Sequence, residues 1–426
     1  MKTKISNHPF SWTTGQWGVF VLTLIVLMLL ATIVNGQMIQ NDHLLIDKLA
    51  NEYVNQKQNR ALVVGIIRNN KQEVYTYGET EKDNKTSPNV NSIFELGQMS
   101  ETFTASLLAI LESKGKISSQ EAVRDILKGI VKVPYYQRFI CKKIASDFTP
   151  SQGFRPPVTV CFPDQEVMPQ AIVLCDLATH SSGLPEEPYT GLFSGKNPFK
   201  DYTIEKLNNF ISQLPPNQSF GYEYQYSMPG IALLGEAMSI KMKTDYATLL
   251  KNEILDPLAM NHTFITPNTE QEKNFLNGHT NKGNYTPHRD YNALSPAAGI
   301  RSNAPDLLTF LAANLSEKNA LNTALRETHV PHIYSSYDAP KFTVSWGWIQ
   351  VPLDKNDLKN SKKMIWQCGE RGGFSTFMAF VKESNTAVVV LSNTNNSVDE
   401  LGQNILKSLG NSTDKIKTAS IVPIKN

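Results

Sequence analysis

Two stretches of this sequence have the spacing of a nucleophile and its base. A serine followed three residues later by a lysine on one helix places the amine beside the hydroxyl, where it can take the proton during acyl transfer. The spacing occurs at Ser113 with Lys116 and at Ser412 with Lys415. The first pair lies at the end of an apolar helical stretch and the second lies in the C-terminal tail, so we expect neither to be catalytic.

Cys368 is a further residue that could supply a nucleophile, as a thiolate. A thiol needs a neighbouring positive charge or histidine to ionise readily, and no histidine stands beside Cys368 in the sequence. We therefore favour a buried or disulfide-bonded cysteine. Metal-ligand spacings and phosphate-binding loops are also absent from the sequence, so we expect no metal and no cofactor.

Hydrophobic periodicity predicts strands at both ends of the chain and helices between them. The first elements are a helix over Leu44–Val54 and strands over Ala61–Arg68 and Glu73–Gly78. The predicted helices of the middle are Met99–Glu112, Gln120–Val131, Ile204–Gln213, Gly230–Ser239, Tyr246–Leu258 and Asp306–Ala313. The closing elements are strands over Phe342–Val351, Lys363–Cys368, Thr376–Lys382 and Ala387–Ser392, then a helix over Val398–Leu409.

This order predicts an α+β fold in which both chain ends pair into one antiparallel sheet, flanked by helices and a central helical lobe. A cleft between sheet and lobe is the natural ligand site. About residues 132–170 the pattern breaks into Pro, Cys and aromatic residues without a clear period, which indicates an irregular insertion.

Several blocks, in family order over residues 43–410, resemble the serine β-lactamases and penicillin-binding proteins, the class C β-lactamase-like hydrolases in particular. The blocks are Phe94-Glu95-Leu96-Gly97, Thr102-Phe103-Thr104-Ala105, LATHSSGLP at 177–185, Tyr226-Ser227, GIALLG at 230–235, ILDPL at 254–258, AGIRS at 298–302 and GGFSTF at 372–377. The resemblance implies the β-lactamase/transpeptidase fold. In that family His180 of the THSSGLP block is a structural turn residue, and we do not assign it as a general base.

The first family motif, Ser-x-x-Lys, is degenerate in this chain. The resemblance places Gln98 at the serine position and Glu101 at the lysine position. An amide is not an acyl acceptor at neutral pH. Ser100 lies two residues beyond Gln98, about 200° further round a helix, so we expect it to point away from the cleft.

The second and third motifs are altered as well. Tyr-x-Asn reads Tyr226-Ser227-Met228, which keeps the tyrosine and loses the amide. Lys-Thr-Gly reads Gln367-Cys368-Gly369, which loses the cation. Tyr226 is thus the one matching catalytic-motif side chain, and without its partners we interpret it as a packed, hydrogen-bonded aromatic.

A polar pocket can outlast the loss of the nucleophile. The resemblance implies that the backbone N–H groups of Gln98 and Glu370 form the oxyanion hole, and backbone donors need no particular side chain. We therefore expect ligand contacts from Gln98, Tyr226, Gln367 and Glu370. Glu101 and Glu370 would disfavour a ligand carboxylate, so weak β-lactam binding or none is expected.

The first 36 residues predict export from the cytoplasm. Lys2 and Lys4 precede an uncharged run over Gly18–Val34, which fits a signal peptide cleaved before Gln37 or a single N-terminal membrane anchor. The 426 residues then divide into this segment, a β-lactamase-related domain over 37–411 and a tail over 412–426. The net charge of +2 gives no reason to expect nucleic acid as a partner.

Four cysteines would then lie in an oxidising compartment, and Cys141 with Cys161 could close a loop as a disulfide.

Three functions remain open. The preferred hypothesis is an extracytoplasmic pseudoenzyme that binds a small acyl or peptide ligand, or a protein partner, without turnover. The first alternative is an active serine-type hydrolase with a relocated nucleophile, such as a β-lactamase, esterase or D-alanyl peptidase. The second is a membrane-tethered structural interaction protein with an empty cleft.

Overall fold

The computed structural model describes residues 21, 23, 42–56, 58–136, 139–144, 147–149, 153–155, 158–163, 170–188, 197–216, 224–334, 342–354 and 361–419, with the backbone alone for 139–163 and 411–419. The chain divides into two compact units, Met1–Leu49 and Ala50–Asn426. The described part of the first unit begins a helix that covers residues 42–54.

An eight-stranded antiparallel sheet forms the framework of the second unit. Its strands, in spatial order, are β13 (Ile333–Tyr334), β14 (Thr343–Val344), β15 (Ile349–Pro352), β16 (Lys363–Arg371), β17 (Phe374–Val381), β18 (Thr386–Ser392), β1 (Leu62–Arg68) and β2 (Lys71–Tyr77). Leu62 pairs with Ser392 and with Tyr77. The predicted pairing of the two chain ends is therefore confirmed.

The turn between β1 and β2 shows how local chemistry sets this sheet. Asn69 and Asn70 have φ angles of 51° and 62°. Two consecutive left-handed residues are the geometry of a tight hairpin turn, and asparagine tolerates that region better than other side chains with a Cβ. The predicted turn at Asn69-Asn70-Lys71 therefore closes a hairpin in which Arg68 faces Lys71.

The register of the strands defines two faces of the sheet. One face carries a row formed by Gly65, Val389, Met378 and Gln367. This face packs against α10 (Ala304–Leu315), because a Cβ on Gly65 would lie 3.0 Å from Leu308 of that helix. On the other face the row runs through Val390, Phe377 and Cys368. There Phe377 packs so closely on α12 (Asp399–Ala419) that a Cβ on Gly402 would lie 2.2 Å from its ring.

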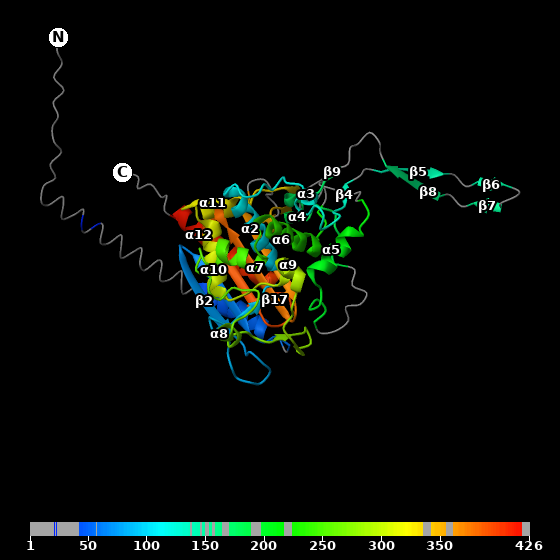
Figure 1. Cartoon of the computed structure of the whole chain (residues 1–426). Coiled ribbons are helices and arrows are strands. Elements are labelled where there is room, and N and C mark those ends of the chain that lie inside the picture. The colour runs from blue at the N-terminus through cyan, green and yellow to red at the C-terminus, as the bar shows by residue number, and fades with distance from the viewer. Residues whose placement is uncertain are drawn as a thin grey trace, which may run out of the picture. The chain divides into compact units, whose positions relative to one another are not determined.

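A helical lobe packs beside the sheet, with α2 (Ser100–Ser113) at its centre (Figure 1). Every residue of α2 from Ser100 to Leu111 is buried, as expected of a helix surrounded by protein. The helices of the lobe and the short strand pairs beside it are α3 (Val123–Ile126), α4 (Leu174–Ala178), α5 (Ile204–Ser212), α6 (Met228–Met242), α7 (Tyr246–Leu250), α8 (Thr269–Glu272), α9 (Ser295–Ala298), α11 (Ala320–Glu327), β3 (Phe94–Glu95) with β12 (Arg301–Ser302), and β10 (Gly278–His279) with β11 (Tyr285–Thr286).

The region of the predicted insertion is more regular than its sequence indicates. Three antiparallel strand pairs are nested in it: β4 (Tyr135–Tyr136) with β9 (Gln170–Ala171), β5 (Phe139–Ile144) with β8 (Val158–Pro163), and β6 (Asp147–Thr149) with β7 (Gly153–Arg155). The register places Cys141 directly opposite Cys161. Directly opposed residues have Cα atoms about 4.5 to 5.5 Å apart, within the range that a disulfide spans; the disulfide itself stays a prediction.

Two predicted helices are shorter than expected. The stretch 120–131 contains only α3, between turns. The stretch 246–258 begins as α7 and continues as a π-helical segment over Lys251–Leu255. In the second case the backbone N–H of Asp256 donates to the carbonyl of Lys251, five residues earlier, which is the hydrogen-bond spacing of a π-helix.

The predicted membrane segment, Gly18–Val34, lies almost wholly outside the described residues. Among those that are described, no helix combines the length and the apolar character needed to cross a membrane.

Candidate functional site

The site lies where β16 meets the start of α2. The 3-10 helix η1 (Gly97–Met99) precedes α2 and turns at Gly97, whose φ angle of 55° suits glycine. Opposite it, a Cβ on Gly369 would lie 2.1 Å from the carbonyl oxygen of Leu96 and 3.0 Å from the nitrogen of Gln98. Glycine at 369 therefore allows the strand to approach the helix start closely enough to form a site between them.

The side chain of Gln98 occupies the position between the two elements. Its Oε1 accepts a hydrogen bond of 3.1 Å from the backbone N–H of Glu370 on β16. That N–H is one of the two donors that the sequence predicted for a ligand oxygen. In this chain the protein's own amide oxygen takes it.

Glu101, one turn further along α2, joins a buried hydrogen-bond network. Its Oε1 accepts from the hydroxyl of Tyr226 at 2.7 Å, and its Oε2 lies 3.0 Å from His180 Nε2. Glu101 is fully buried and His180 is 4 % exposed. The position that holds a basic amine in the resembling family therefore holds an acceptor surrounded by two donors.

The second nitrogen of His180 identifies its tautomer. The backbone N–H of Ser227 lies 3.1 Å from His180 Nδ1 and donates to it, so Nδ1 carries no proton. The remaining proton lies on Nε2 and is donated to Glu101. His180 is thus a neutral donor whose backbone adopts a left-handed turn, with a φ angle of 54°.

Tyr226 also serves as a donor. Its burial, together with the adjacent charge of Glu101, raises the pKa of the phenol well above its ordinary value. A phenol that keeps its proton across the physiological range cannot take one from a nucleophile. Tyr226 therefore lies beside Glu101 as a buried, hydrogen-bonded aromatic, and the role of its hydroxyl stays a prediction.

Three other motif positions have their hydrogen-bonding or packing needs met inside the protein. Gln367 Nε2 donates to the carbonyl of Gly347 at 3.3 Å, and its Oε1 accepts from the N–H of Cys368 at 3.0 Å. Met228 is fully buried in the hydrophobic core. Gly369 is buried, whereas the neighbouring Glu370 presents its side chain to solvent.

Two serine hydroxyls and one thiol close to the motif positions are engaged or buried within the protein. Ser100 is fully buried, and its Oγ accepts from the backbone N–H of Ile300 at 3.1 Å. Ser227 Oγ donates to the carbonyl of Pro185 and caps α6 by accepting from Gly230. Cys368 lies on the α12 face of the sheet, where burial and then the neighbouring Asp399 raise the pKa of the thiol.

Sequence reasoning missed one ion pair beside these motifs. Arg371, at the end of β16, lies 2.7 Å from Glu187, which follows the LATHSSGLP block. The β-carbon of Arg371 also lies close to Gly97. An arginine and a glutamate separated by 184 positions carry no local signal of pairing, so the sequence alone could not reveal this ion pair between the sheet and the helical side.

The comparisons with known proteins agree with this fold. The Beta-lactamase family model matches residues 46–410. A β-lactamase of Providencia stuartii is 25 % identical over 373 residues, 82 % of this chain and 86 % of that protein. The D-alanyl-D-alanine-carboxypeptidase/endopeptidase AmpH of Escherichia coli is 22 % identical over 78 % of each chain.

Solved structures show the same fold. D-alanine carboxypeptidase AmpC from Burkholderia cenocepacia superposes with a TM-score of 0.67 at 21 % identity, over 88 % of this chain and 99 % of that one. A class C β-lactamase superposes with a TM-score of 0.65 at 22 % identity, over 86 % and 95 %. With the family match spanning most of its length, this chain belongs to the β-lactamase family.

Proposed function

We propose that this protein is an extracytoplasmic member of the β-lactamase family that binds its ligand without forming a covalent bond to it. The observation that carries the proposal is the hydrogen bond from the Glu370 N–H to Gln98 Oε1. The residue at the nucleophile position has no hydroxyl or thiol, and its amide takes one of the predicted oxyanion donors. A member without nucleophile and base retains at most the rate that binding and the oxyanion hole supply.

The network around Glu101 supports the same conclusion. Acyl transfer needs a group that accepts the nucleophile's proton at the right distance. The carboxylate of Glu101 is shielded from solvent and already accepts from Tyr226 and His180. We infer that the network holds α2, the His180 turn and the start of α6 together.

The ligand we propose is a small acyl compound or a peptide. Two relatives are named as D-alanine carboxypeptidases, which favours a peptide ligand. Its carbonyl would replace Gln98 Oε1 on the Glu370 N–H. The exchange trades one amide hydrogen bond for another, so its net free energy is small and binding should be weak.

The proposed test measures turnover and binding together on the purified full chain. β-Lactam hydrolysis and D-alanine release are followed spectroscopically. Calorimetry follows the binding of a D-alanyl-D-alanine peptide amidated at its C-terminus, which removes the carboxylate that Glu101 and Glu370 disfavour. Binding without turnover supports the proposal. Turnover would establish the hydrolase alternative, and the absence of both would favour a structural interaction protein.

The matched control is the double variant Gln98→Ser, Glu101→Lys, which restores the family's residues at both positions. A gain of turnover in this variant would show that the surrounding cleft is otherwise competent. Turnover in the parent chain that equals that of the variant would contradict the proposal.

A further inference from the structure

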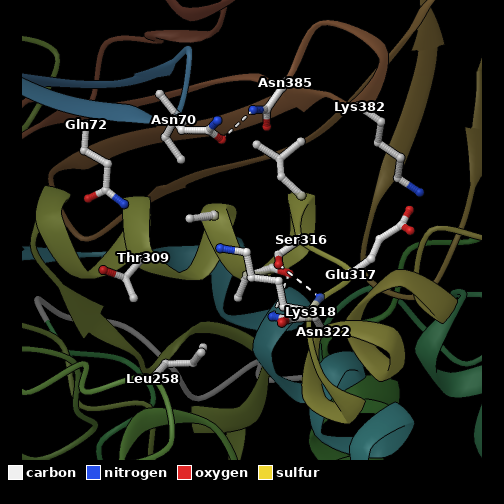
Figure 2. Close-up of a pocket in the computed structure, with 14 residues that line it drawn as sticks. Asn70, Gln72, Leu258, Thr309, Ser316, Glu317, Lys318, Asn322, Lys382 and Asn385 are labelled. Carbon is white, nitrogen blue, oxygen red and sulfur yellow. Dashed lines mark hydrogen bonds between the residues drawn. The ribbon is translucent and has the colours of Figure 1, made fainter. Parts of the chain in front are cut away.

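A large cavity lies away from the motif residues. It has a volume of about 950 Å³ and opens between the hairpin ends at Asn70 and Asn385 and the C-terminal end of α10 (Figure 2). Asn385 donates to Asn70 at 2.8 Å, which joins the two hairpin ends. The apolar side chains of the wall are those of Ile67, Leu258, Ala312, Ala313 and Leu315. A cavity of this size holds a small organic molecule, and its apolar side chains favour one with an apolar body.

The cavity and the cleft lie at different ends of β17. Near the start of this strand Thr376 donates to the carbonyl of Leu96, which precedes η1 at the cleft. Lys382, which lines the cavity, follows the last residue of β17 and begins the 3-10 helix η4 (Lys382–Ser384). The strand rises on the order of 20 Å between Thr376 and Lys382. A small molecule in the cavity is therefore remote from the cleft.

Lys382 brings a half-buried amine to the cavity wall. Among the residues that the structure describes, none forms a hydrogen bond or an ion pair with its ammonium. The carboxylate of Glu317, which lies across from Lys382 in Figure 2, is the ion-pair partner of Arg326. Lys318, an exposed residue of the same wall, adds a positive charge. The amine of Lys382 is therefore left available to a molecule in the cavity.

The surroundings of Lys382 favour the uncharged form of its amine. Burial, and then the positive charge of Arg326, lower the pKa of Lys382 from 10.5 to about 8. The carboxylates of Glu383 and Glu327 act in the opposite direction and do not offset these effects. Burial, Lys382 and Arg326 also lower the pKa of His329 well below its ordinary value, so this histidine adds no charge at neutral pH. At pH 7 about a tenth of the Lys382 side chains are uncharged, about 300 times the fraction at the ordinary pKa.

We propose that Lys382 is a nucleophile that forms an imine with a small aldehyde held in this cavity. A lysine that is partly desolvated beside another cation is the kind of amine that attacks carbonyl groups. The lone pair of Nζ adds to the carbonyl carbon and forms the C–N bond. The carbonyl oxygen then leaves as water with the two protons of the amine as the C=N bond forms. The step needs no other reactant, and it is independent of the function proposed for the cleft.

Reductive trapping tests the proposal on the purified full chain at pH 7. Benzaldehyde with cyanoborohydride converts each imine into a stable benzylamine, and peptide mapping by mass spectrometry measures the labelling rate at each lysine. We expect Lys382 to be labelled at least about tenfold faster than the exposed Lys251, which pairs with Asp256. The rate at Lys382 should saturate with benzaldehyde, because the aldehyde binds before it reacts. Equal rates at the two lysines, or a rate at Lys382 that rises linearly up to about 10 mM, would overturn the proposal.

Three variants separate the cavity from the amine. Ala312→Phe narrows the cavity from α10 and should slow labelling of Lys382 by benzaldehyde at least about tenfold, but labelling by the much smaller formaldehyde less than about threefold. Arg326→Gln removes the positive charge and frees Glu317, and both effects favour the ammonium, so labelling should slow by about 3- to 10-fold. Lys382→Arg keeps the charge and should lose the fast label.

Circular dichroism checks that Ala312→Phe is folded. If it is not, Thr309→Phe narrows the same wall from a half-buried position and should show the same loss. Unchanged benzaldehyde labelling of Lys382 in a folded Ala312→Phe or Thr309→Phe chain would exclude this cavity as the aldehyde site. A fast label that persists in Lys382→Arg would exclude Lys382 as the nucleophile.

Discussion

Removing the hydroxyl of Tyr226 should destabilise the protein. The hydroxyl donates at 2.7 Å to the buried carboxylate of Glu101. Hydrogen bonds to charged groups contribute about 1.5 to 3 kcal/mol to stability, and water cannot replace the donor at a fully buried carboxylate. We therefore expect Tyr226→Phe to lower the free energy of unfolding by about 2 kcal/mol.

A double-mutant cycle assigns this loss to the Tyr226–Glu101 pair. In Glu101→Gln the acceptor is neutral, and a neutral hydrogen bond contributes about 1 kcal/mol. Tyr226→Phe should then cost about 1 kcal/mol less in that background than in the parent. The exposed Tyr285→Phe serves as the matched control and should change stability by less than about 0.5 kcal/mol.

Urea unfolding of the four chains and the control, fitted with one common slope, measures these differences. A coupling below about 0.3 kcal/mol, or a Tyr226→Phe chain as stable as its parent, would refute the view that Tyr226 now holds the fold together.

Three further predictions follow from the same geometry. Gln98→Ala frees the Glu370 N–H from its internal acceptor, so the amidated D-alanyl-D-alanine peptide should bind about 2- to 10-fold more tightly by calorimetry. Weaker binding would argue against competition by the Gln98 side chain. Gly369→Ala places a methyl group against the Leu96 carbonyl and should lower the free energy of unfolding, measured in urea, by about 3 kcal/mol. The control Gly410→Ala on α12 has no atom nearer than 4.0 Å to the added methyl group and should not destabilise the protein. Equal effects of the two variants would contradict the close approach of β16 to η1. Burial raises the pKa of Glu95 from 4.5 to about 7, so its contribution to the free energy of unfolding is full below pH 4.5 and is lost, by up to about 3 kcal/mol, as pH rises to about 7. Glu95→Gln should flatten this part of the stability profile, whereas Glu52→Gln at an exposed position should not. An unchanged slope in Glu95→Gln would contradict the assignment.

The sequence predicted the sheet well because its strands carry strong local patterns. β18 is buried at each of its seven positions and reads as an almost uninterrupted apolar run, and β1 beside it is buried throughout. Short strands such as β6 and β7 have no room for a period, since three residues show at most one alternation. The strand pairs between 135 and 171 were therefore interpreted as irregular.

The site was only partly predictable for a related reason. Family motifs located Gln98, Glu101 and Tyr226 and indicated that their chemistry had changed. Their present partners depend on the tertiary fold: Glu101 meets His180 across 79 residues and Tyr226 across 125. His180 was interpreted as a turn residue, and its left-handed backbone is that of a turn, but its ring completes the buried network. No spacing in a single sequence indicates such contacts.

The central claim is that the cleft forms no acyl bond, and intact-mass analysis tests it most directly. The purified full chain is incubated separately with penicillin and with a fluorophosphonate, alongside the Gln98→Ser, Glu101→Lys variant. We predict that the parent keeps its unmodified mass with both reagents, because Gln98 offers no nucleophile and Glu101 is engaged by Tyr226 and His180. A stoichiometric adduct on the parent chain would contradict the account, and the labelled peptide would identify the nucleophile.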